Sequence, residues 1–83
     1  MQITSNILTP DTLRMLEAIA QAGSFAGAAR QLGLVPSALT YRVRQIEDAL
    51  DVLLFDRSSR QARPTAAGAE LLAQGERLKQ EVD

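Results

Sequence analysis

Arginine side chains gather in the middle of this chain, where their guanidinium groups could bind anions. Between residues 30 and 63, six arginines and four acidic residues leave a net charge of +2, although the whole chain carries −1. A local basic face on a mildly acidic molecule is compatible with a nucleic-acid partner, and ordinary solvated surface is the alternative interpretation. The six are Arg30, Arg42, Arg44, Arg57, Arg60 and Arg63.

Hydrogen-bonding side chains follow one side of a predicted helix at residues 36–50. Its apolar residues recur at i, i+4, i+7 and i+11 and define a buried face, formed by Leu39, Val43, Ile46 and Leu50. The opposite side carries Ser37, Tyr41, Arg44 and Asp48, with Thr40 at its edge. We therefore expect this helix to pack on a core with one face and to offer hydroxyl and guanidinium groups with the other.

Two residue types with distinctive chemistry are missing from the sequence. The chain has no cysteine, which excludes disulfides and thiolate sites, and no histidine, the commonest metal ligand and general base. We find no nucleophile–base pair, so we expect no catalysis, no metal and no other cofactor. No apolar run approaches the roughly 20 residues that span a bilayer. The first ten residues lack a signal-peptide layout. A cytoplasmic protein without a membrane partner is the default expectation.

Capping residues divide the first half of the chain into three predicted helices. Thr9-Pro10 begins the first and Ser24 caps the second; each ends at a glycine, and Pro36 opens the third. A helix, a glycine-containing turn and a second helix make a helix-turn-helix, which we place at residues 25–44. A generic three-helix bundle without a ligand is the alternative.

A short β-hairpin is predicted after the third helix. Residues 52–55 are β-prone, residues 56–61 have the composition of a turn, and Ala62-Arg63 is the expected return strand, ended by Pro64. Such a small hairpin is marginally stable unless it packs on the helices.

The predicted fold class is mainly α, a winged helix-turn-helix of three helices plus a two-stranded wing. We assign residues 1–64 to this domain, with the wing at 53–64. Thr65 then caps a fourth helix. This long linker or dimerisation helix occupies residues 65–83.

Residues near the start of a recognition helix lie against base edges in the major groove of DNA. Ser37 and Thr40 can exchange hydrogen bonds there, and the Thr40 methyl can touch a thymine methyl. Tyr41 offers a hydroxyl and a flat ring. Arg44, one turn further on, is placed for a phosphate, whereas Arg42 suits either a phosphate or a salt bridge at the edge of the core.

The predicted wing carries arginines at every third position, between small polar residues. A wing that lies along a duplex can insert an arginine into a narrow minor groove. Arg57 suits a structural pair with Asp56 or Glu47 equally well, whereas Arg60, at the predicted turn tip, favours DNA. The start of the second helix, at Ser24, has free backbone N–H groups that point outward and suit a phosphate. The wing residues assigned to DNA contact are Arg57, Ser58, Arg60 and Arg63.

The fourth helix has a stripe with the spacing of a coiled-coil seam. Each glycine in it costs about 1 kcal/mol of helix propensity relative to alanine, and close approach of a second helix would explain both. The alternative is that Leu71 and Leu72 cover the first helix of the same chain, which we prefer for Leu72. The predicted dimer interface consists of Gly68, Leu71, Gly75, Leu78 and Val82.

The chain from residue 13 to residue 72 resembles the N-terminal domain of LysR-type transcriptional regulators. The resemblance implies that the third helix is the recognition helix and that the fourth pairs two subunits, so that a homodimer binds double-stranded DNA sequence-specifically on a palindromic operator and regulates transcription. In that family a larger domain follows, which binds a small-molecule effector. We expect this chain to be a fragment excised from such a longer protein. The matching residues are Leu13, Gly23-Ser24-Phe25, Ala28-Ala29, Leu32, Ser37-Ala38-Leu39-Thr40, Val43, Ile46-Glu47, Leu50, Leu54-Phe55, Arg57, Arg60, Thr65 and Gly68.

Three departures from the family pattern bear on DNA recognition. Val35-Pro36 stands where serine and glutamine are usual, so base contact at Pro36 should be apolar or absent. Tyr41 replaces a frequent arginine, and Asp51 replaces a glycine, although aspartate can adopt left-handed geometry. A winged-helix module that binds only protein partners is the alternative function.

Overall fold

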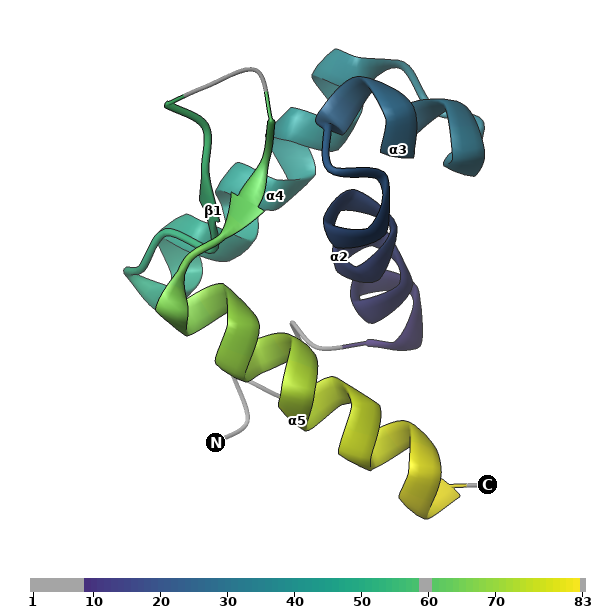
Figure 1. Cartoon of the computed structure of the whole chain (residues 1–83), viewed down its shortest axis with the longest axis vertical. Helices are drawn as coiled ribbons and strands as arrows, with labels where there is room; N and C mark the ends of the chain where they lie inside the picture. The colour runs from purple at the N-terminus through teal and green to yellow at the C-terminus, as the bar shows by residue number, and fades with distance from the viewer. Residues whose placement is uncertain (1–8, 59–60, 83) are drawn as a thin grey trace.

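The computed structural model describes residues 9–58 and 61–82, with side chains up to residue 77. The helices and strands follow the predicted order, which confirms a mainly helical winged helix-turn-helix with a long final helix. Figure 1 shows α3 and the hairpin at one end of the molecule and α5 at the opposite end. The elements are α2 (Pro10–Ala22), α3 (Phe25–Leu32), α4 (Pro36–Leu50), β1 (Phe55–Asp56), β2 (Arg63–Pro64) and α5 (Ala66–Val82).

Local hydrogen bonds explain where the first two helices begin and end. The Thr9 Oγ1 atom accepts from the Thr12 N–H at 3.1 Å, and the Ser24 Oγ atom accepts from the Gly27 N–H at 3.0 Å. Gly23 ends α2 with a φ of 74°, in the left-handed region that favours glycine. These caps depend only on neighbouring residues, which is why the sequence indicates them.

The core lies where the three helices of the body meet the hairpin. Its largest fully buried side chains come from α2, α4 and the residues at the start of the hairpin: Leu16, Ile19, Leu39, Val43, Leu54 and Phe55. The rings of Phe25 and Phe55 meet edge to face, with their centroids 5.9 Å apart. The hairpin is thereby packed on the helices, the condition that its small size requires.

The return strand of the hairpin begins one residue later than predicted. Strand β2 pairs antiparallel with β1, with Phe55 opposite Pro64 and Asp56 opposite Arg63. Ala62 is buried, and its N–H donates to the Gly23 carbonyl at 2.9 Å, so it is tied to the helical body. Pro64 is therefore part of the strand and does not end it; a two-stranded hairpin has free edges, where a missing N–H is tolerated.

Helix α5 packs against α2 and β2. Its start is capped by Thr65, whose Oγ1 accepts from the Gly68 N–H at 3.1 Å. The Thr65 N–H donates to the Leu54 carbonyl at 3.0 Å, which ties the start of α5 to the first arm of the hairpin. Within the ranges that the structure describes, no helix combines the length and hydrophobicity needed to cross a membrane.

Candidate nucleic-acid interface

Helix α4 has the two faces that the periodicity predicts. Leu39, Val43 and Ile46 are buried, and Leu50 is half-buried. The opposite side exposes Ser37, Tyr41, Arg42, Arg44 and Asp48, with Thr40 half-buried at the edge. The packing of one face on the core therefore holds a row of polar side chains in solvent, in a fixed order along the helix.

Tyr41 lies in the middle of this exposed row. Its side chain is 64% exposed, and its hydroxyl oxygen accepts a hydrogen bond from Gln45 Nε2 at 3.2 Å, one turn further along α4. The bond orients the ring and leaves the hydroxyl proton free to donate. The sequence analysis missed the role of Gln45, although the i, i+4 spacing of the two residues was a usable signal.

The exposed arginines of α4 differ from Arg57 in how their charge is used. Arg42 and Arg44 form no ion pair with another described residue. The sequence analysis kept a salt bridge at the edge of the core as an alternative for Arg42. No described acidic residue forms that salt bridge. Both guanidinium groups are therefore available to an external anion.

Arg57 is engaged within the domain. Its Nη2 atom lies 3.3 Å from Glu47 Oε1, and the guanidinium carbon stands 4.7 Å from the centre of the Phe25 ring, in cation–π geometry. Its Nε atom is buried without a hydrogen-bond acceptor among the described residues. Of the alternatives open for Arg57, the structure shows the pair with Glu47; DNA contact by Arg57 stays a prediction.

Glu47 has a wider structural role than the pair with Arg57 that the sequence analysis considered. Its carboxylate is buried on the core side of α4, and Oε2 accepts from the Leu54 N–H at 2.8 Å and the Phe55 N–H at 3.3 Å. The available signal was its position four residues after Val43, on the apolar face of the helix. One side chain therefore joins α4 to the first strand of the wing and to Arg57.

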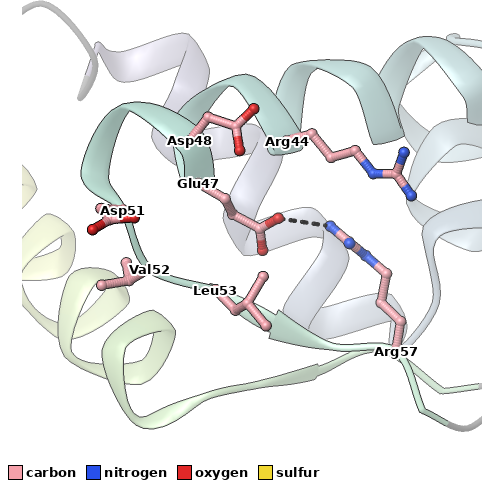
Figure 2. A pocket seen from close by; sticks show the side chains of 7 residues that line it. All are labelled: Arg44, Glu47, Asp48, Asp51, Val52, Leu53 and Arg57. Atoms are coloured by element: carbon pink, nitrogen blue, oxygen red, sulfur yellow. Dashed lines mark hydrogen bonds and ion pairs between the residues drawn. The ribbon is translucent and has the colours of Figure 1, made fainter.

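A surface pocket of about 530 Å³ lies between the second half of α4 and the start of the hairpin. Figure 2 shows Arg44 and Arg57 on one side of it and Asp51 and Val52 on the other. Asp48 also lines it, and the last turn of α4 contains no basic residue. Because a helix C-terminus carries partial negative charge, this end of α4 is electrostatically unfavourable for a phosphate.

The described wing residues form a turn with its own hydrogen bonds. Asp56 Oδ1 accepts from the Ser58 N–H at 2.9 Å; this bond, with the Ser58 side chain and the nearby charge of Arg63, lowers the pKa of Asp56. Arg63 is exposed and donates through Nε and Nη2 to Gln61 Oε1 at 3.3 and 3.1 Å. Arg60, the predicted tip contact, lies outside the described residues.

As expected from the sequence, the start of α3 is capped by a side chain and the start of α4 is not. The Ser24 oxygen is used as a cap, so Ser24 retains its hydroxyl proton for a ligand. Val35 occupies the N-cap of α4 without any side-chain hydrogen bond, and Pro36 follows it, exposed. Asp51 ends α4 with φ 58° and ψ 37°, the left-handed geometry expected of it.

The proposed reason for the two glycines of α5 is wrong. A Cβ atom at Gly68 would overlap the carbonyl group of Leu54, and one at Gly75 would lie 2.7 Å from Leu13 Cδ2. Leu71 and Leu72 are half-buried against the core of the same chain. The glycines thus permit α5 to approach its own domain; the same spacing also suits a second helix, which is why the sequence did not separate the two. The side chains of Leu78 and Val82 lie outside the described residues.

A helix-turn-helix with a packed hairpin and an exposed polar second helix is a winged-helix domain of the DNA-binding class. Residues 10–69 match the family described as bacterial regulatory helix-turn-helix protein, lysR family. The chain belongs to this family, as the sequence resemblance implied.

Named relatives and solved structures agree with this assignment. The chain is 47% identical over 76 residues to a probable HTH-type transcriptional regulator, YhaJ, of Escherichia coli K12, covering 92% of this chain and 26% of YhaJ. It is 48% identical over 64 residues to the regulator PunR of the same organism, covering 77% of this chain and 21% of PunR. The chain thus spans about a quarter of the length of these relatives.

The similar solved structures include domains in complex with DNA. A complex of the CbnR DNA-binding domain with DNA aligns with a TM-score of 0.76 at 33% identity, covering 84% of this chain and 80% of that one. A complex of the BenM domain with benA site 1 DNA gives 0.77 at 28% identity, covering 86% and 80%.

Proposed function

We propose that this chain binds double-stranded DNA sequence-specifically, as the DNA-binding domain of a transcription regulator. The observation that carries the proposal is the exposed row on α4, which the buried face of the same helix holds away from the core. Ser37 and Tyr41 offer hydrogen bonds to base edges, and Arg42 and Arg44 offer unpaired charge to phosphates. Two similar domains were solved in complex with DNA, which supports the same function for this chain.

The charges along α4 suggest how the helix docks. Asp48 and Asp51 make its last turn electronegative, whereas Arg42 and Arg44 precede them. We therefore place the first half of α4 in the major groove. The wing lies at the same end of the molecule as α3 (Figure 1). Its exposed Arg63 would contact the neighbouring phosphate backbone of the DNA. Arg57 contributes chiefly by fixing the wing to α4 through Glu47.

Selection of bound duplexes from a random pool tests this function, and Arg44→Ala tests the docking. On a selected duplex, each phosphate neutralised contributes a slope of about −0.9 in log K against log salt. Arg44→Ala should weaken binding to all sequences nearly alike and make the slope less steep by about 1. Fluorescence anisotropy at several salt concentrations measures both quantities.

The matched control for Arg44 is Arg14→Ala, which removes an exposed arginine of α2 that pairs with Asp11. It should leave affinity and slope unchanged. A changed base preference in Arg44→Ala would contradict a phosphate contact. If no duplex were enriched from the pool, the protein-binding alternative would replace the proposed function.

We also propose that two copies pair through α5 and that the pair binds a palindromic operator. With Gly68 and Gly75 turned toward their own domain, the pairing face that remains includes Ala69 and Ala73, which are exposed. A two-fold dimer places two recognition helices on half-sites about 34 Å apart, or a multiple of that distance. A pseudo-palindromic selected sequence would agree with this arrangement.

Ala73→Glu tests the pairing face without disturbing the core. We expect the wild-type chain to sediment as a dimer at micromolar concentration in analytical ultracentrifugation, and Ala73→Glu as a monomer, because the added charge would be buried in the interface. Gln31→Glu makes the same change in net charge on an exposed position of α3 and should stay dimeric. A wild-type chain that sediments as a monomer would show that α5 does not pair two copies by itself.

A further inference from the structure

The start of α4 exposes apolar surface where a helix normally carries a polar cap. Val35 is the N-cap residue, makes no side-chain hydrogen bond to the helix, and is 63% exposed. Thr9 and Ser24, at the starts of α2 and α3, each accept a hydrogen bond from the helix backbone. A polar residue in place of Val35 would stabilise α4. With valine at this position, α4 lacks a side-chain cap and the apolar Val35 side chain is exposed to water.

The residues on either side hold the Val35 side chain outward. Leu34 packs against the core, and its N–H donates to the Ala29 carbonyl at 2.9 Å. The Val35 carbonyl accepts from the Ala38 N–H at 3.1 Å and the Leu39 N–H at 3.3 Å. Pro36 restricts the backbone, and a β-branched side chain has few rotamers. The result is a stiff apolar tip at the N-terminal end of α4 that, under the proposed function, enters the major groove.

We propose that the Val35 side chain reads the 5-methyl group of a thymine, with Pro36 holding the tip in place. This inference rests on the proposed DNA binding. The thymine methyl is the apolar group among the features that base pairs present in the major groove. Opposite any other base edge, the Val35 methyls would displace water from donors or acceptors without replacing the lost hydrogen bonds. Ser37, two residues on, supplies a polar contact to a neighbouring base.

Replacing thymine with deoxyuridine removes only this methyl group and tests the proposal directly. The probe is the duplex selected from the random pool, synthesised with deoxyuridine at one thymine at a time. For wild-type protein we expect one position in each half-site where the substitution weakens binding about fourfold, the fold-change that corresponds to ~0.8 kcal/mol per buried carbon. At positions that neither Val35 nor the Thr40 methyl contacts, affinity should change little. Fluorescence anisotropy measures the ratio.

Val35→Ser identifies the side chain responsible. The serine removes both methyls and restores a polar cap, so the variant should fold and still bind the duplex, with equal affinity for thymine and deoxyuridine at that position. Val52→Ser is the matched control: Val52 is 41% exposed, follows the other end of α4, and should keep the fourfold ratio. Thr40→Ser removes the other methyl near the row and should also keep the ratio at the Val35 position.

The outcomes separate this inference from the proposed function. If wild-type protein bound every deoxyuridine duplex as tightly as the thymine duplex, Val35 would read no methyl group. A fourfold ratio that persisted in Val35→Ser would equally overturn the assignment. Both results leave DNA binding intact, whereas failure to enrich any duplex would remove the proposed function itself.

Discussion

Gly68→Ala should destabilise this domain more than any other single methyl addition to α5. The new Cβ would overlap the Leu54 carbonyl oxygen and lie 3.0 Å from the Leu54 carbonyl carbon and 3.3 Å from its Cα. These are backbone atoms of a segment already tied to α5 by the bond from Thr65 N–H to the Leu54 carbonyl. Neither side can give way, so we expect a loss of about 3 kcal/mol or more, despite the better helix propensity of alanine.

Urea unfolding followed by circular dichroism measures the loss, and Gly75→Ala is the matched control. At Gly75 the new Cβ meets Leu13 Cδ2 at 2.7 Å, the end of a side chain that can change rotamer. The gain of about 1 kcal/mol in helix propensity should offset much of that cost. A Gly68→Ala protein as stable as wild type, or less affected than Gly75→Ala, would mean that α5 does not lie against Leu54 in solution.

Glu47→Ala should cost about 3 kcal/mol and loosen the wing. The substitution leaves the Leu54 and Phe55 N–H groups buried without their acceptor, and each unsatisfied buried donor costs roughly 1–3 kcal/mol. The lost pair with Arg57 adds less than a fully buried pair would, because the Arg57 side chain is 30% exposed and can turn to water. DNA affinity should fall as well, since the hairpin would lose its attachment to α4.

Asp48→Ala is the control for Glu47, because it removes the adjacent acid from the exposed side of α4. We expect it to change the free energy of unfolding by no more than about 0.5 kcal/mol. Glu47→Gln should fall between the two variants, because it keeps one acceptor oxygen and loses the charge. Equal stability of Glu47→Ala and Asp48→Ala in urea would exclude Glu47 as the link between helix and wing.

The features that the sequence predicts well are those set by nearby residues. Thr9 and Ser24 each cap a helix by accepting a hydrogen bond from the backbone N–H three residues ahead. The positive φ of Gly23 ends α2 without help from the rest of the fold. The two faces of α4 follow from the helical period, so the exposed positions of Ser37 and Arg44 were also predictable. The sequence therefore defines both the recognition helix and its solvent-facing residues.

Features that depend on residues far apart in the chain were left open. For Arg57, a structural pair with Asp56 or Glu47 and a DNA contact were equally suitable, and only the placement of the wing over α4 brings its guanidinium to Glu47 and Phe25. The start of the return strand was missed by one residue because the Ala62 N–H bonds to the Gly23 carbonyl, 39 residues earlier in the chain. Neither contact leaves a local pattern.

The glycines of α5 show most clearly what the sequence alone determines. Their spacing established that something approaches one side of the helix closely, because two glycines on one stripe are costly in a helix. A second copy and the chain's own domain would produce the same spacing. Only the tertiary structure placed the Leu54 backbone against Gly68 and the Leu13 side chain against Gly75, since a helical period records which face is covered but not what covers it.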